Sequence, residues 1–161
     1  MIILVCIDIL LIIVIRENMK YVKILEGYNL SENIPCYNKL KYGMKLPKFK
    51  VTGVGNIDVS SSDVKGKVVI IQFFIPDNKN HREKVLAIDK FVGKHRHKVI
   101  FIAISQGNIK WLLNRGFKLD NGILVDDENL SIWKHFGIGA GCGGIIIANK
   151  HRKVIFSAVG I

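Results

Sequence analysis

The sequence predicts one α/β domain with a central mixed sheet and helices on both faces. Val68–Phe74 and Lys98–Ser105 are continuous apolar, β-branched runs of the kind that is buried on both faces of a parallel sheet. Between them, Asn80–Val92 carries apolar residues at helical spacing with charged residues in between. The three segments therefore predict a strand, a crossover helix and a second parallel strand, joined with the usual right-handed connection.

Two shorter elements are expected before this unit. Lys48–Thr52 and Ile57–Val59 flank the turn-forming residues Gly53–Asn56, which predicts a hairpin. Ser60–Asp63 offers capping side chains for a single helical turn that ends before Gly66.

Capping residues and short apolar runs predict the remaining elements of the domain. Gly93 is expected to cap the end of the crossover helix, and Asn108 and Asp127 to cap the starts of two further helices. Ile123–Val125 predicts a short third strand. The last elements, Gly144–Ala148 and Lys153–Ala158, predict a hairpin around a polar turn. This order is typical of a mixed sheet with helices on both faces.

The charge balance favours acidic partners but does not identify a particular one. The 161 residues include 24 Lys and Arg against 13 Asp and Glu, a formal net charge of +11. Such a charge attracts anionic surfaces over a long range. The basic residues are scattered apart from the run Lys94–Lys98, which can be a solvated loop or an anion-contacting patch. Because no helix-turn-helix, zinc-finger or stacking-aromatic signature accompanies it, specific nucleic-acid binding is not expected.

The first fifteen residues leave the localisation open. Met1–Ile15 is apolar except for Asp8, but a bilayer span needs about 20 such residues. The segment can be a short membrane anchor, which would make the protein membrane-associated, on a side that the sequence does not settle. If translation begins at Met19, the protein is cytoplasmic instead. A signal peptide would need a basic start and a small-residue cleavage site, and both are absent.

These observations divide the chain into three parts. We expect an apolar N-terminal segment over 1–18, a linker or irregular lead-in over 19–41, and the folded domain over 42–161. The three cysteines, Cys6, Cys36 and Cys142, are an odd set at spacings that fit no metal site. They predict neither a disulfide framework nor a zinc site.

Several short motifs occur together in one order along the chain. They are Gly43-x-x-x-Pro47-x-Phe49, Lys65-Gly66-Lys67 before an apolar strand, Trp133-x-x-Phe136-Gly137, and a final hairpin that ends in Val159-Gly160. Over about 42–160 the chain thereby resembles the alkyl hydroperoxide reductase and thiol-specific antioxidant group of thioredoxin-like redoxin proteins. The most similar relatives look like the membrane-tethered thiol-disulfide proteins of cytochrome c maturation or methylamine utilisation.

The resemblance implies a thioredoxin-like fold and one missing element. Members of this family continue past the last hairpin into a helix that covers one face of the sheet, whereas this sequence stops at Ile161. We therefore expect either that the chain is truncated or that a partner, or residues 21–42, covers that face.

The same resemblance implies a degenerate active site. The family's Cys-x-x-Cys pair falls on Asn78 and His81, and the peroxidase motif, counted from Pro76, places its cysteine on Glu83. The proline that faces the active site in the family falls near Gly143. Thiol-disulfide exchange needs a thiolate at a helix N-terminus, and none of these residues supplies one.

Cys142 is the one thiol that the resemblance places near this site. It can be a small buried residue in a glycine-rich loop, or a lone redox thiol opposite His81. On its own, His81 is expected to be a solvated residue at the helix start. A metal site from His81, Cys142 and either His95 or His97 is chemically possible, but it is not expected because the latter pair belongs at the far end of the helix.

Two functions remain open at this point. The first is a membrane-tethered binding or assembly module with a protein partner, which keeps the fold and has lost dithiol catalysis. The second is a thiol-disulfide oxidoreductase or redox sensor that acts through the single thiol Cys142. No cofactor is expected, and whether the protein is an enzyme stays undecided.

Overall fold

A five-stranded mixed sheet forms the centre of the domain in the computed structural model, which describes residues 36–160. Its strand order is β5-β4-β3-β6-β7. The strands are β3 (Val68–Phe74), β4 (Val99–Ser105), β5 (Ile123–Asp126), β6 (Gly144–Ala148) and β7 (Val154–Val159). A separate hairpin joins β1 (Lys50–Gly53) and β2 (Ile57–Ser60).

The predicted strand, helix and strand unit is confirmed. β3 pairs in parallel with β4, with Val68 opposite Val99 and Phe74 opposite Ser105, and α2 (Lys79–Gly93) connects them. β5 adds a third parallel strand, while β6 runs antiparallel to β3 and begins beside its carboxyl end. The carboxyl ends of β3, β4 and β5 therefore lie at the same end of the sheet as the start of β6.

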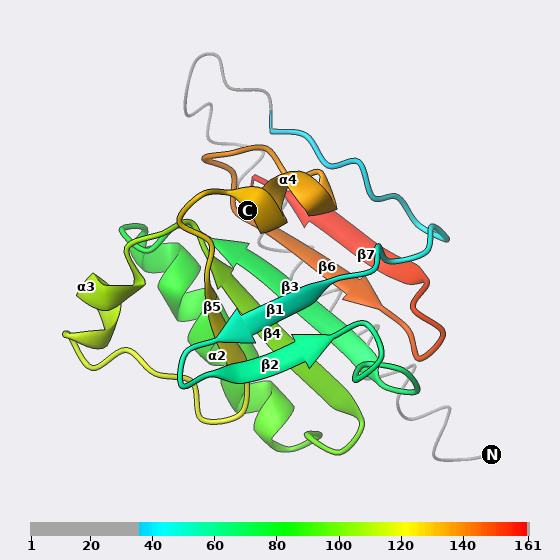
Figure 1. The fold of residues 1–161 in the computed structure, drawn as a ribbon, viewed down its shortest axis with the longest axis horizontal. Helices are drawn as coiled ribbons and strands as arrows, with labels where there is room; N and C mark the ends of the chain where they lie inside the picture. Colours follow the sequence, from blue (N-terminus) through cyan, green and yellow to red (C-terminus); the bar gives the residue numbers. More distant parts are fainter. Residues whose placement is uncertain (1–35, 161) are drawn as a thin grey trace. The chain divides into compact units, whose positions relative to one another are not determined.

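Described elements lie on both faces of the sheet. Figure 1 shows α2 behind the sheet, with the β1–β2 hairpin and α4 (Ser131–Phe136) in front of it; α3 (Ile109–Leu113) lies beyond β5. Alternate residues of β3 point to opposite faces, and both sets are almost fully buried. This explains why β3 reads as a continuous apolar run.

An aromatic cluster fills the face that α4 covers. The Phe73 ring lies 5.4 Å from the Trp133 ring and 5.6 Å from the Phe136 ring, measured between centroids, and all three side chains are at most 1% exposed. α4 is held at its start by Asp127, whose Oδ2 accepts a hydrogen bond from the Trp133 backbone N–H at 2.8 Å. The predicted capping role of Asp127 is thus confirmed, although the N-cap position itself is Leu130.

Three local predictions differ from the structure. Residues 61–66 form turns and no helix, while Ser60 ends β2 and donates its N–H to the Asp63 carboxylate. Gly93 is the last residue of α2 and not its cap; a β-carbon there would lie 2.8 Å from Asn121 Nδ2, so close packing explains the glycine. Asn108 does occupy the N-cap position of α3, as predicted, but its side chain makes no capping hydrogen bond and its φ of 60° is left-handed.

A buried carboxylate ties α2 to the loop before β5. Asp89 is 5% exposed and accepts hydrogen bonds from the backbone N–H groups of Asp120, Asn121 and Gly122 at 2.6 to 3.0 Å. Three donors satisfy a charge that would otherwise be costly to bury. Asp89 therefore fixes the position of this loop against the helix.

Residues 36–46 run beside the last hairpin before β1 begins. Asn38 forms an isolated bridge with Ile138, and Lys45 with Lys153. Among residues 36–160 no helix is both long and apolar enough to cross a bilayer. The expected anchor over 1–15 and the rest of the lead-in up to residue 35 lie outside the described residues.

Candidate functional site at the start of helix α2

Helix α2 begins directly beside the carboxyl end of β3. Asn78 is its N-cap residue, with φ −81° and ψ 113°, and the Asn78 Oδ1 accepts a hydrogen bond from the His81 backbone N–H at 3.2 Å. Capping of this kind satisfies one of the N–H groups that a helix start leaves without an intrahelical acceptor. The amide side chain of Asn78 is thus engaged in holding the helix.

His81 is buried at this site, where the sequence predicted a solvated residue. Its side chain is 7% exposed, and its Nδ1 accepts a hydrogen bond from the Ile75 backbone N–H at 3.1 Å. The expectation was wrong because the ring turns back over the loop between β3 and α2. Since Nδ1 accepts, a neutral His81 ring carries its proton on Nε2.

Gly143 lies against the His81 ring. A β-carbon at Gly143 would lie 2.5 Å from His81 Cε1 and 2.8 Å from Nε2. Contacts of that length do not occur, so only glycine fits beside the ring in this arrangement. The structure therefore brings together Asn78, His81 and Gly143, three positions that the sequence placed at one site.

Cys142 is bonded to Cys36, which overturns the expectation of a lone thiol. The disulfide spans 106 residues with a Cα–Cα distance of 5.6 Å, within the usual range for such bonds. Cys142 is 2% exposed, whereas Cys36 is exposed. The expectation that the cysteines form no disulfide was wrong because spacing along the chain carries no information about two segments that meet only in the fold.

The loop around Cys142 is fixed by hydrogen bonds on both sides. The Gly141 N–H donates to Gln106 Oε1 at 3.0 Å, and the Gly160 N–H donates to the Gly143 carbonyl at 2.7 Å. On the other side of the disulfide, the Lys39 N–H donates to the Gly137 carbonyl at 3.1 Å. The disulfide therefore joins a lead-in segment and a loop that also contact each other through their backbones.

Comparison of the whole fold with solved structures gives consistent neighbours. A protein from Chlorobium tepidum, assigned as a thiol:disulfide interchange protein DsbE, matches with a TM-score of 0.65 and 16% identity over 74% of this chain and 85% of that one. One from Bacteroides thetaiotaomicron, assigned as a protein disulfide isomerase, matches with a TM-score of 0.64 and 19% identity over 78% and 82%. A secreted Mycobacterium tuberculosis disulfide oxidoreductase matches with a TM-score of 0.57 and 12% identity over 68% and 81%.

The domain has a thioredoxin-like fold. These identities establish the fold and nothing finer, so the more specific resemblance to the alkyl hydroperoxide reductase group stays a prediction. No protein-family model matches the sequence, and no curated protein sequence matches it significantly.

Glu83, the position reached by the peroxidase motif, lies on the outer surface of the thioredoxin-like domain. It is exposed and forms an ion pair with Lys79 at 3.7 Å. His95 and His97 follow the C-terminal end of α2, which at 15 residues is about 22 Å long. They are therefore far from His81, and within the described residues no three potential ligands gather into a metal site.

A cationic and aromatic stack beside the helix start was not anticipated from the sequence. The Arg115 guanidinium carbon lies 4.4 Å from the centroid of the Trp111 ring, and that of Arg82 lies 5.9 Å from it. Arg82 Nη1 also donates to the Pro76 carbonyl at 2.5 Å. The two distances from a guanidinium carbon to the Trp111 ring fall within the range of cation–π attraction. Because Arg82 belongs to α2 and Trp111 to α3, their contact places these helices next to each other.

Acidic residues 126–128 lie at the carboxyl end of β5. Burial raises the pKa of Asp126, and the neighbouring Glu128 carboxylate raises it further. Asp127 is used in holding α4. Asp127 therefore has the capping role that the sequence predicted for it.

Proposed function

We propose that this protein is a thioredoxin-like binding or assembly module that has lost dithiol catalysis. The proposal rests on the start of α2, where Asn78 and His81 stand at the positions that the resemblance assigns to the family's two cysteines. Both side chains are engaged in backbone hydrogen bonds that hold the helix and the preceding loop. A thiolate at this helix start is what the chemistry requires, and amide and imidazole groups cannot replace it.

A groove between the lead-in and the last strand supports a protein partner. It has a volume of about 600 Å³ and lies between residues 36–42 and the edge strand β7. Tyr37 and Tyr42 at its rim are 51% and 81% exposed. Exposed tyrosines are enriched at protein interfaces, and an edge strand can accept an extended peptide as an added strand.

Reduction of insulin by dithiothreitol, followed as turbidity, tests the loss of catalysis. The full chain should not accelerate the reaction above the rate without protein. A matched variant, Asn78→Cys with His81→Cys, restores the thiol spacing and reports whether the scaffold still supports exchange. Steady turnover by the unaltered chain would refute the proposal.

The second candidate function is thiol-disulfide exchange through Cys142, with Cys36 as its partner instead of Cys142 acting alone. The exposure of Cys36 supports it, because an external thiolate can attack an accessible sulfur. A substrate dithiol would be oxidised to a disulfide while Cys36 and Cys142 become thiols, with two electrons and two protons transferred. In that case Cys36→Ser and Cys142→Ser should each abolish exchange, whereas Cys6→Ser should leave it unchanged.

We further propose that residues 1–15 tether the domain to a membrane. The support is the apolar composition of this segment, which is interrupted only by Asp8. Cell fractionation with protease protection tests the tether and its side. A protein recovered wholly in the soluble fraction would exclude it.

A further inference from the structure

A basic hollow lies at the opposite end of the sheet from the α2 start. It has a volume of about 560 Å³ and is formed where β3 begins and where the β6–β7 hairpin turns. Its basic side chains are Lys45, Lys48, Lys65, Lys150, His151 and Arg152. They come from three separate segments of the chain, and Phe49 and serines 60–62 complete the lining.

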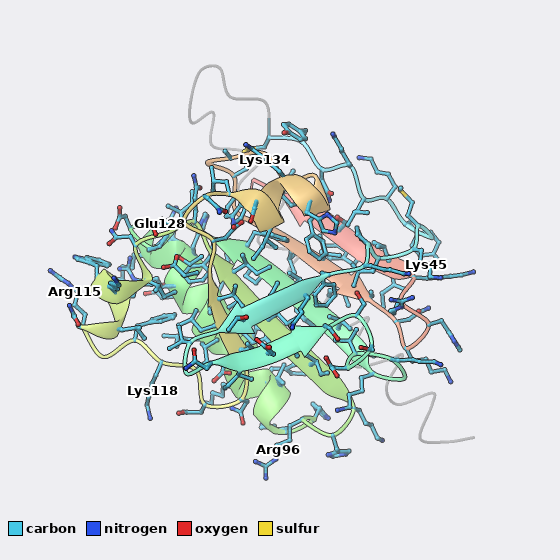
Figure 2. All side chains as sticks on the ribbon, viewed as in Figure 1. Lys45, Arg96, Arg115, Lys118, Glu128 and Lys134 are labelled. Carbon is cyan, nitrogen blue, oxygen red and sulfur yellow. A yellow bond between two sulfur atoms is a disulfide. The ribbon has the colours of Figure 1, made fainter. Side chains whose placement is uncertain are left out.

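Backbone hydrogen bonds hold the three segments together. The Leu46 N–H donates to the Arg152 carbonyl at 2.7 Å, and the Gly66 N–H donates to the Lys150 carbonyl at 3.1 Å. The positions from which these cations extend are therefore fixed relative to one another. The Lys45 side chain points away from the ribbon into solvent (Figure 2).

The hairpin turn is also fixed from within. Asn149 Oδ1 accepts hydrogen bonds from the backbone N–H groups of His151 and Lys153, at 3.0 Å each. Arg152 has a φ of 61°, a left-handed conformation that residues with a β-carbon seldom adopt. A turn constrained in this way presents Lys150 and Arg152 in a defined arrangement.

Within residues 36–160, none of the six basic side chains forms an ion pair; the pairs found there are Lys50–Asp58, Lys79–Glu83 and Lys118–Asp120. Asp63, close in sequence to Lys65, forms no ion pair with any of them. Its Oδ2 accepts from the Ser60 N–H at 2.8 Å and from the Ser60 Oγ at 2.6 Å. The hollow thus gathers like charges, which repel one another unless an anion balances them.

We propose that this hollow binds a compact polyphosphate, meaning a molecule with two or more phosphoryl groups, either free or as the headgroup of a lipid. Its volume is that of a typical small-molecule site. Lysine ammonium groups bind phosphate as point charges, and an arginine adds a bidentate contact. Four lysines and one arginine carry five full charges, more than a single phosphate, at about −1.5 to −2, can balance.

Isothermal titration of the full chain with sodium tripolyphosphate, at physiological ionic strength, tests the site. Lys65→Gln with Lys150→Gln removes two charges from the hollow. Lys90→Gln with Lys134→Gln removes two from exposed positions on α2 and α4. The first variant should bind tripolyphosphate roughly tenfold more weakly, and the second within about twofold of the unaltered chain.

Two further probes distinguish the sources of the phosphate. Free inositol trisphosphate is compared with phosphatidylcholine vesicles that contain a phosphatidylinositol bisphosphate, after subtraction of binding to phosphatidylcholine alone. Binding of the free probes without extra vesicle binding supports a soluble ligand. Extra vesicle binding that Lys65→Gln with Lys150→Gln abolishes supports a headgroup. Failure of all probes to bind, or equal weakening by both double variants, would overturn the proposal.

Discussion

The two ends of one sheet differ in how they use their polar side chains. At the carboxyl end of β3, Asn78 and His81 are hydrogen-bonded to the backbone and Cys142 is cross-linked to Cys36. At the amino end of β3, six basic side chains surround a hollow without forming ion pairs among the described residues. The first end is built to hold the fold, whereas the second leaves its charges available to a ligand.

The contrast is visible in the placement of single charges. In Figure 2, Lys45 lies on the opposite side of the view from Glu128, which belongs to the acidic group after β5. Lys45, one of the basic residues that line the hollow, thus lies apart from this acidic group. Variants at the two ends should consequently differ in both the size and the salt dependence of their effects.

Removal of the disulfide should have the largest effect. Cys36→Ser is expected to lower the free energy of unfolding by about 4 kcal/mol, because the bond closes a loop of 106 residues and so restricts the unfolded chain. Denaturation in guanidinium chloride measures this, with Cys6→Ser as the control. If Cys36→Ser and the unaltered chain unfold at the same concentration, the bond does not constrain the fold.

Gly143→Ala should have the next largest effect. Its β-carbon would lie 2.5 Å from His81 Cε1, and the overpacking is expected to cost about 1 to 3 kcal/mol. Gly139→Ala is the matched control in the same loop, since a β-carbon there would meet Tyr37 at an ordinary 3.4 Å. Adding His81→Ala to Gly143→Ala should recover part of the loss; additive losses would show that the two residues are not in contact.

The sequence predicted much of the fold because its signals were local and periodic. β3 and β4 could be recognised from apolar runs, and α2 from its spacing of apolar residues. The capping role of Asp127 followed from its position alone. Short helices were placed less well, because α3 has five residues and α4 six, and the residues at their N-cap positions, Asn108 and Leu130, are left-handed and make no side-chain capping bond.

The sites could be predicted only in part. Asn78, His81 and Gly143 were placed together through the family resemblance, and they do lie together. The Cys36–Cys142 bond was missed because its partners are 106 residues apart. The one available signal was that the lead-in contains a cysteine. The basic hollow combines three distant segments, so no single charge run in the sequence marks it.

The turn that lines the hollow should respond to acid. Hydrogen bonds from the Ser60 side chain and then its backbone lower the pKa of Asp63 below its ordinary value of 3.8. Because the folded-state pKa is depressed, the stabilisation is present above pH 3.8 and is lost as the pH falls through the lowered pKa. Asp63→Ala should therefore lower the melting temperature at pH 7 and have less effect in strong acid. A difference that stays constant with pH would contradict this role.

Relief of repulsion in the hollow should give the smallest effect, and one of opposite sign. Lys65→Gln with Lys150→Gln is expected to raise the melting temperature slightly at low ionic strength, because two like charges are removed. The gain should vanish in high salt, where such interactions are screened. A decrease at low salt would indicate that these lysines stabilise the fold through contacts other than those described.

The reduction potential of the Cys36–Cys142 bond tests the central claim most directly. The full chain is equilibrated in thiol buffers of known potential, its free thiols are alkylated, and the two forms are counted by mass. Because Cys142 is buried and both segments are also joined by backbone contacts, we predict a structural bond with a potential below about −300 mV. A potential in the range of about −120 to −270 mV, typical of exchanging oxidoreductases, would contradict the account and favour redox activity through Cys142.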